Sequence, residues 1–170
     1  MKTFESAAAD APTAPDRLLV GVSDYVVAED GETLVAYGLG ACVAVALYDP
    51  EAGVGALAHT MLPHQPAEGG SPGKYADEAV RTMLRELVAR GGDYEAAEAW
   101  LVGGAEIFAL PDIADGAGER NVAAAREQLA ALDVALAGMA VGGSRGRTVE
   151  FDTATGEVRV STADGHEEVL

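Results

Sequence analysis

A cysteine and a histidine lie close together in this sequence and have the chemistry of a catalytic pair. Cys42 is the only cysteine among the 170 residues, and His59 follows it on the next predicted strand. A thiol becomes a good nucleophile when a neighbouring imidazole takes its proton, so the pair suits covalent attack on a carbonyl carbon. Glycine-rich backbone precedes the cysteine, and we expect the N–H groups around Gly40 and Ala41 to face an oxyanion there.

Each of these residues also has a purely structural interpretation. A single cysteine in an apolar strand is most often part of the packing, and a histidine in a neighbouring strand is often a hydrogen-bonded core residue. Asn121, the only asparagine, invites a Cys–His–Asn arrangement. It also suits the N-terminal cap of a helix running to about Leu132, and we favour that interpretation.

The segments that carry Cys42 and His59 predict a β-hairpin. CVAVALY and VGALAHTML are apolar on both faces, and residues 49–53 form a turn between them. Side chains alternate faces, so turn length decides whether the two can meet. A two-residue turn places them opposite each other, a three-residue turn separates them, and a four-residue turn makes them diagonal neighbours. Pro50 and Gly53 suit the four-residue turn, which predicts a shared face.

The rest of the chain predicts one α+β domain with mixed sheets. An apolar stripe at three- and four-residue steps predicts a helix over residues 76–88, and residues 147–162 predict a second hairpin. We expect one long strand over residues 17–28 and an exposed loop over residues 63–74. The predicted domain spans residues 17–162, between a disordered acidic tail, 1–16, and an acidic C-terminal tail, 163–170.

The charge balance and the single cysteine exclude several classes of protein. Asp and Glu total 28 against 11 Lys and Arg, giving a formal charge of −17, which disfavours nucleic-acid binding and membrane adhesion. An acidic, lysine-poor surface is also typical of proteins kept soluble in concentrated salt. One cysteine forms neither an intramolecular disulfide nor a zinc thiolate cluster, and we expect no metal or cofactor. The longest uncharged run, residues 33–48, is short for a membrane span, so we expect a cytoplasmic protein.

Six segments in order resemble one known family, the chemoreceptor glutamine deamidases called CheD. The segments are GLGACVAVALYDP, GALAHTMLP, PGKYADEAV, GGAEIF, GERNV and GGSRGRTVEF, and the likeness extends from about Val20 to Val160. The resemblance implies a cysteine amidohydrolase that converts glutamines of methyl-accepting chemotaxis receptors to glutamate, with Cys42 as nucleophile and His59 as general base. It also implies an α/β sandwich related to the cytotoxic necrotising factor toxins, and docking with the CheC phosphatase.

Two departures from the family pattern leave a second interpretation open. The family usually has a threonine six residues before the cysteine, where this chain has Ala36. It also tends to have an aspartate before the GG of GGSRGR, where this chain has Val141. Without the threonine hydroxyl the imidazole needs another orienting group, and Thr33, Ser23 and Thr60 are the candidates. The alternative function is a binding module that regulates CheC or receptors with little or no turnover.

Three further residues are candidates for a partner surface. Arg145 and Arg147 stand out on so acidic a chain and either form ion pairs at a sheet edge or contact an acidic partner. Phe108 is an apolar candidate for the same surface, although core burial is its alternative.

The net charge predicts that salt stabilises this protein. Self-repulsion at −17 is screened over ~10 Å at 0.1 M salt and over ~3 Å at 1 M. We expect the free energy of unfolding, measured by urea titration, to be higher in 1 M KCl than in 0.1 M. NaCl should act like KCl, and a stability that stays unchanged with salt would contradict the prediction.

Overall fold

The computed structural model describes residues 16–29, 31–107 and 116–170. Residues 1–15 of the tail predicted over residues 1–16 and the candidate Phe108 therefore lie outside the described residues. Elements follow in the order β1 (Arg17–Leu19), β2 (Tyr25–Ala28), β3 (Thr33–Leu39), β4 (Val43–Asp49), β5 (Val54–Thr60), a 3-10 turn (Pro72–Lys74), α1 (Ala76–Ala89), β6 (Glu98–Gly103), α2 (Ala117–Ala131), β7 (Ala135–Val141), β8 (Arg147–Asp152), β9 (Glu157–Thr162) and β10 (Glu167–Val169).

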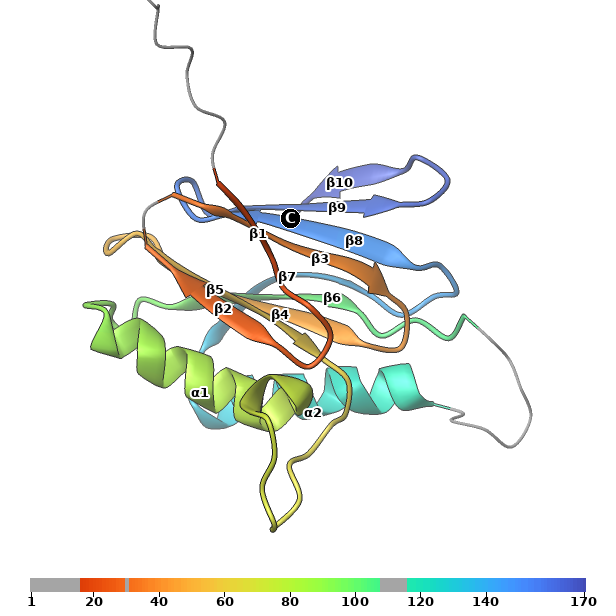
Figure 1. Cartoon of the computed structure of the whole chain (residues 1–170), viewed down its shortest axis with the longest axis horizontal. Helices are drawn as coiled ribbons and strands as arrows, with labels where there is room; N and C mark the ends of the chain where they lie inside the picture. Colours follow the sequence, from red (N-terminus) through yellow and green to blue (C-terminus); the bar gives the residue numbers. More distant parts are fainter. Residues whose placement is uncertain (1–15, 30, 108–115) are drawn as a thin grey trace, which may run out of the picture.

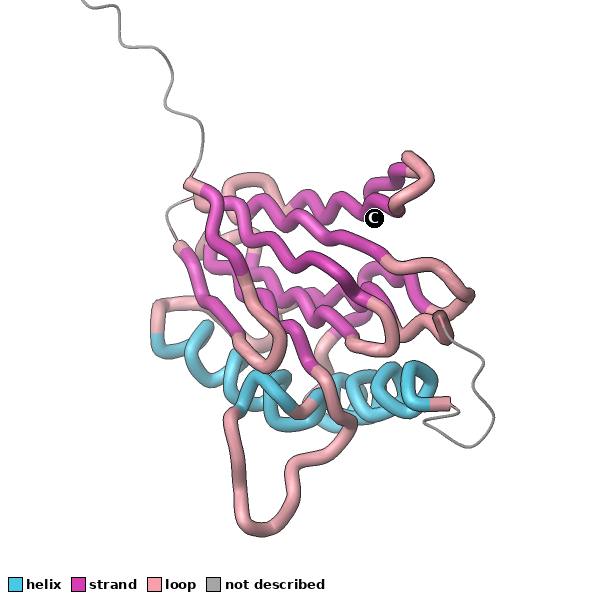
Figure 2. Tube along the Cα trace, turned by 45° about the vertical axis from the view of Figure 1, so that its right-hand side comes forward, coloured by secondary structure: helices cyan, strands magenta, loops and turns pink. Residues whose placement is uncertain are grey.

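The described residues form three layers, two β-sheets and one layer of helices (Figure 1). The outer sheet has the strand order β1-β3-β8-β9-β10, and the central sheet has the order β2-β5-β4-β6-β7. Both sheets are mixed, because β1 pairs with β3 and β6 pairs with β7 in parallel while the other pairs are antiparallel. Helices α1 and α2 cover the face of the central sheet that points away from the outer sheet (Figure 2). The α+β class with mixed sheets is confirmed.

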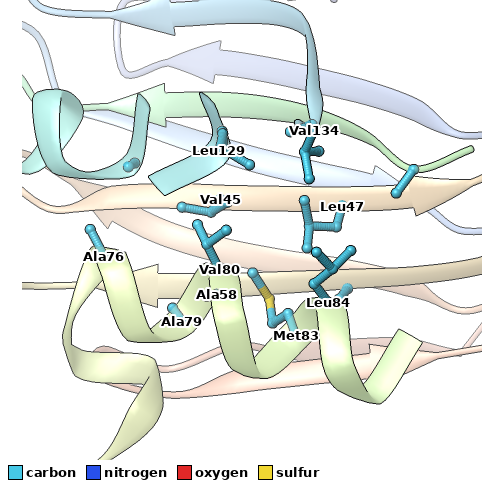
Figure 3. Close-up of a cluster of buried hydrophobic side chains, with 14 of the residues drawn as sticks. Val45, Leu47, Ala58, Ala76, Ala79, Val80, Met83, Leu84, Leu129 and Val134 are labelled. Atoms are coloured by element: carbon cyan, nitrogen blue, oxygen red, sulfur yellow. The ribbon is translucent and has the colours of Figure 1, made fainter. Parts of the chain in front are cut away.

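The central sheet is buried on both faces, which explains why its strands are apolar throughout. All seven residues of β4 and all seven of β5 are buried. Val45 and Leu47 point toward the helices, where Val80 and Leu129 meet them (Figure 3). The alternate side chains of β4 point toward the outer sheet and pack in the inter-sheet core.

Helix α1 follows from its sequence as predicted. Its buried face comprises Ala76, Ala79, Val80, Met83, Leu84 and Leu87. Asp77 and Glu78 occupy the first turn, where carboxylates suit the positive end of the helix dipole. Gly91 has a φ of 94°, and the Gly92 N–H donates to the Leu87 carbonyl at 3.0 Å, which ends the helix. Neither described helix is long and apolar enough to cross a membrane.

The register of the β4–β5 hairpin agrees with the four-residue turn. Asp49 pairs with Val54, and the ladder continues to Ala44 opposite His59 and Val43 opposite Thr60. The Gly53 N–H donates to the Asp49 carbonyl at 2.9 Å, and Gly53 has a φ of 65°, which glycine tolerates best. Side chains of even-numbered β4 residues and odd-numbered β5 residues therefore share the face toward the outer sheet.

The single long strand predicted for residues 17–28 is wrong. The chain forms β1 in the outer sheet, turns at residues 20–24, and forms β2 in the central sheet. Ser23 adopts a φ of 68°, a left-handed conformation that breaks the strand. Tertiary pairing to two different sheets decides this break, and the apolar pattern of the segment carries no sign of it.

Helix α2 begins earlier than predicted, at Ala117, with Gly116 in the left-handed conformation before it. Asn121 is therefore inside the helix, and its interpretation as the N-cap is wrong. The early turn is rich in small residues, and Gly118 is needed there because a Cβ at that position would lie 2.4 Å from the Gly104 carbonyl oxygen. The close packing of the helix backbone against the Gly104 backbone therefore requires a glycine within the helix.

The acidic residues 163–170 contain a strand where a tail was expected. Strand β10 pairs with β9 in antiparallel fashion, with Glu168 opposite Val160. The Leu170 N–H donates to the Val158 carbonyl at 2.9 Å, and its side chain packs partly against the inter-sheet core. The open edge of β9 and this single apolar anchor outweigh the acidic composition of the segment.

The inter-sheet core predicts a strong effect at Phe151. This fully buried ring on β8 meets Tyr48 edge-on at a centroid distance of 5.7 Å and Trp100 at 6.3 Å. We expect Phe151→Ala to lower the free energy of unfolding by about 3–5 kcal/mol, because it would leave a cavity in the core between the two sheets. The exposed Val88→Ala control should stay within about 0.5 kcal/mol. Urea denaturation measures both, and equal small effects would contradict the role of Phe151.

Candidate active site

Cys42 lies where the chain passes from one sheet to the other. Strand β3 ends at Leu39 in the outer sheet, and β4 begins at Val43 in the central sheet. Cys42 is half-buried and packs against the inter-sheet core. The Ile107 side chain packs closely over Gly40, because a Cβ there would lie 2.9 Å from Cδ1 of Ile107. The short crossover thus places the half-buried thiol at the junction between the two sheets.

The backbone around Cys42 is held by a glycine turn that follows β6. The Gly104 N–H donates to the Cys42 carbonyl at 2.9 Å, and the Ala105 N–H donates to the Gly40 carbonyl at 2.8 Å. A Cβ at Gly103 would lie 2.3 Å from the Cys42 carbonyl oxygen, so only glycine allows this approach. The Gly103-Gly104-Ala105 turn therefore packs against the backbone of the cysteine.

His59 lies near the end of β5 and is only 2% exposed. Its backbone is fixed on both sides, because the His59 N–H donates to the Asp24 carbonyl at 3.0 Å and the Ser23 N–H donates to the His59 carbonyl at 2.8 Å. The register places His59 opposite Ala44 on the inter-sheet face, the side on which Cys42 packs. Cys42 precedes Ala44 by two residues, and such diagonal positions across a hairpin lie ~7–8 Å apart between Cα atoms.

Burial keeps both members of the pair neutral. It raises the pKa of the Cys42 thiol, although the backbone N–H of the same residue acts in the opposite direction. It lowers the pKa of His59, while a hydrogen bond between the ring and the Val20 backbone opposes that shift. Nε2 of His59 is buried and has no hydrogen-bond partner among the described residues. The site therefore holds a thiol and an imidazole whose Nε2 has no hydrogen-bond partner among the described residues.

The position of the usual threonine offers no hydroxyl. Ala36 is fully buried on β3 and belongs to the inter-sheet core. Thr60 follows His59 directly, so it projects to the opposite face, and its Oγ1 donates to the Val43 carbonyl at 2.8 Å. Thr33 has the opposite parity to Ala36 along β3, and Ser23 Oγ lies 4.0 Å from the sulfur of Met61. The group that remains to orient the His59 ring is the Val20 backbone.

The two candidate arginines have partners within the chain. Arg145 pairs with Asp164, and Nη1 of Arg147 donates to the Gly142 carbonyl at 2.8 Å. The Arg145 contact matches the expected ion pair, whereas Arg147, the first residue of β8, donates to a loop carbonyl and forms no ion pair within the described residues. A partner contact by Arg145, which is exposed, stays a prediction.

Asn121, which the sequence analysis assigned to a helix cap in preference to a Cys–His–Asn arrangement, reaches this site from the helix layer. Its side chain is 2% exposed, and Nδ2 donates to the Ala41 carbonyl at 2.9 Å and to the Met61 carbonyl at 3.1 Å. Ala41 directly precedes Cys42, and Met61 follows His59 by two residues. A lone asparagine facing inward on a helix was the available signal, but it required the correct start of α2.

Comparison with known proteins shows the family to which the chain belongs. The family described as CheD chemotactic sensory transduction matches residues 61–162. A probable chemoreceptor glutamine deamidase CheD of Natronomonas pharaonis is 41% identical over 157 residues, which cover 91% of this chain and 93% of the relative. The chemoreceptor glutamine deamidase CheD of Thermotoga maritima is 40% identical over 151 residues, covering 89% and 95%. A probable CheD of Geobacter metallireducens is 45% identical over 146 residues, covering 83% and 90%. The chain therefore belongs to the CheD family.

Proposed function

We propose that this protein is a cysteine-dependent deamidase that converts glutamine side chains of methyl-accepting chemotaxis receptors to glutamate. The observation that carries the proposal is the placement of Cys42 and His59 on one face of the β4–β5 hairpin, with Nε2 of His59 lacking a partner in the described structure. Relatives named as chemoreceptor glutamine deamidases supply the substrate class. A cytoplasmic location and a fold related to the cytotoxic necrotising factor toxins are part of this proposal.

The proposed reaction proceeds through a thioester. His59 takes the thiol proton, and the Cys42 sulfur attacks the carboxamide carbon of the glutamine. The carbonyl oxygen becomes an oxyanion, which backbone N–H groups of residues 40–42 stabilise. His59 returns the proton to the departing nitrogen, and ammonia leaves. Water, deprotonated by His59, then hydrolyses the thioester, releasing glutamate and restoring the thiol.

Because both groups are neutral in the free protein, we expect the Cys42 thiolate to form only when substrate is bound. Burial raises the pKa of Cys42 and lowers that of His59, so the thiolate–imidazolium form is disfavoured in the free protein. We infer that proton transfer from Cys42 to His59 follows substrate binding. This arrangement protects the thiol from adventitious electrophiles until a carboxamide is bound.

Exposed apolar side chains beside the site support a protein substrate. Met61 and Leu62 follow the strand of His59 and are 46% and 40% exposed, and Ile107, 41% exposed, lies against Gly40. Apolar groups clustered at a polar molecule's surface are typical of sites that contact other proteins. We infer that a receptor helix contacts these residues when its glutamine enters the site.

The absence of a hydroxyl at Ala36 favours a second candidate function. A weakly catalytic or inactive chain would serve as a binding module for receptors or for a CheC-type phosphatase. Docking with CheC remains a prediction from the family resemblance. Conversion and binding assays on the same receptor fragment separate the two functions.

The deamidase proposal predicts that turnover depends on Cys42. Incubation of a receptor cytoplasmic fragment with the wild type should convert specific glutamines to glutamate, detected by mass spectrometry of its peptides. Cys42→Ala removes the nucleophile, and we expect it to lower the rate by at least about 10³-fold. Val88→Ala, a substitution of an exposed residue away from Cys42, is the control variant and should convert the fragment at the rate of the wild type. Equal conversion by Cys42→Ala, or none by the wild type, refutes the proposal, and binding without conversion supports the binding module.

The raised pKa of Cys42 predicts slow alkylation of the free protein near neutral pH. We expect the iodoacetamide rate to rise with pH through a midpoint above the ordinary thiol value of 9.0, because burial disfavours the thiolate. The same cysteine in urea-unfolded protein is the control, since the chain has no other thiol.

The same shift has a consequence for stability. The folded state binds the thiol proton more tightly than the unfolded state. The resulting contribution to the free energy of unfolding is complete below the unfolded pKa of Cys42 and is lost as pH rises through its folded pKa.

The alkylation experiment also has an outcome that would contradict the neutral site. An alkylation rate of the folded protein that already reaches its plateau below pH 7 would indicate a preformed thiolate–imidazolium pair.

A further inference from the structure

One buried side chain connects the two chain segments that carry the candidate pair. Nδ2 of Asn121 donates one hydrogen bond to the Ala41 carbonyl at 2.9 Å and another to the Met61 carbonyl at 3.1 Å. The β4–β5 ladder stops at Val43 opposite Thr60, so both carbonyls lie just beyond its last pair. The amide thus joins the two strands where their own hydrogen bonding has ended.

The bond to Ala41 determines the direction of a neighbouring donor. In a trans peptide the C=O and the following N–H point in opposite directions, and the structure contains no cis bond in its described residues. Because the Ala41 carbonyl points toward α2 and Asn121, the N–H of Cys42 points away from the helix layer. That direction is toward the inter-sheet face, where the Cys42 side chain packs.

The peptide units on both sides of the Ala41–Cys42 peptide are held as well. The flanking carbonyls of Gly40 and Cys42 accept hydrogen bonds from the turn after β6, so three successive peptide units are fixed. Of these fixing groups, only that of Asn121 comes from a side chain and can be changed without altering the backbone.

The other end of the amide has no partner among the described residues. Oδ1 of Asn121 is buried and has no hydrogen-bond partner in the part of the chain described. An unsatisfied buried acceptor destabilises a fold, and an apolar side chain would avoid that cost on this helix face. The donated hydrogen bonds are what an asparagine supplies here.

We propose that Asn121 is a positioning residue that orients the Cys42 N–H as an oxyanion donor and holds the Cys42 loop against the strand of His59. The inference rests on the proposed function, because it assigns a role within that reaction. Asn121 does not touch the reacting atoms, and it acts through the Ala41–Cys42 peptide.

Kinetics of two variants test this role. Asn121→Asp keeps the shape and loses both donors when ionised, and Asn121→Ala removes the amide. We expect kcat for deamidation to fall about 10–100-fold, with KM changed less than about 3-fold, because a misdirected donor weakens only the oxyanion. Iodoacetamide alkylation of Cys42 should change less than about 3-fold, since that displacement forms no oxyanion. The control is Gln128→Ala on the same helix, whose amide oxygen accepts from Arg81 at 3.0 Å, and it should leave kcat unchanged.

The outcomes distinguish the two proposals. Unchanged kcat in folded Asn121 variants overturns the positioning role while leaving the deamidase intact. Parallel losses of kcat and alkylation overturn it as well, because they indicate general disruption. No conversion by the wild type refutes the deamidase, and the orientation is then decided by hydrogen exchange of the Cys42 N–H, which Asn121→Asp should accelerate and Gln128→Ala should not.

A measurement on the wild type keeps the test valid if the variants do not fold. Side-chain amides occur only at Asn121, Gln65 and Gln128, so their NMR signals are readily assigned. Both Asn121 amide protons should exchange with solvent at least about 10-fold more slowly than those of Gln128, because both are buried and donated. Exchange as fast as that of Gln128 overturns the proposal.

Discussion

The alternation of side chains along β4 and β5 is the constraint on which the candidate site depends. The central sheet lies between the outer sheet and the helices, so each residue of these strands faces one layer or the other. A shift of the hairpin by one residue would send the His59 ring into the helix layer and bring Thr60 to the inter-sheet face. Burial on both faces makes that shift costly, because apolar cores on both sides hold the same register.

That burial also determines the chemistry of the pair. An imidazole enclosed between two sheets loses hydration, which lowers its pKa, and a half-buried thiol loses some as well, which raises its pKa. The replacement of the usual hydroxyl by Ala36 leaves the ring to be oriented by packing and by the Val20 backbone.

The sequence alone was sufficient where local rules decide the structure. Pro50 and Gly53 fix a turn length, the turn length fixes the register, and the register decides that Cys42 and His59 share a face. It was insufficient where distant segments decide. The break of residues 17–28 into two strands depends on pairing with different sheets, and β10 depends on the open edge of β9. Asn121 was misassigned because the small residues before it hid the first turn of α2.

The acidic residues of the C-terminal strand have a specific effect at the edge of the outer sheet. Strand β10 ends the outer sheet, is three residues long, and exposes Glu167 and Glu168. An unpaired sheet edge is a template on which another chain can add a strand, and short length with like charges opposes such addition. Two identical molecules approaching through this edge would bring four carboxylates together. The residues that form the edge of the outer sheet thus also oppose the addition of strands from other molecules.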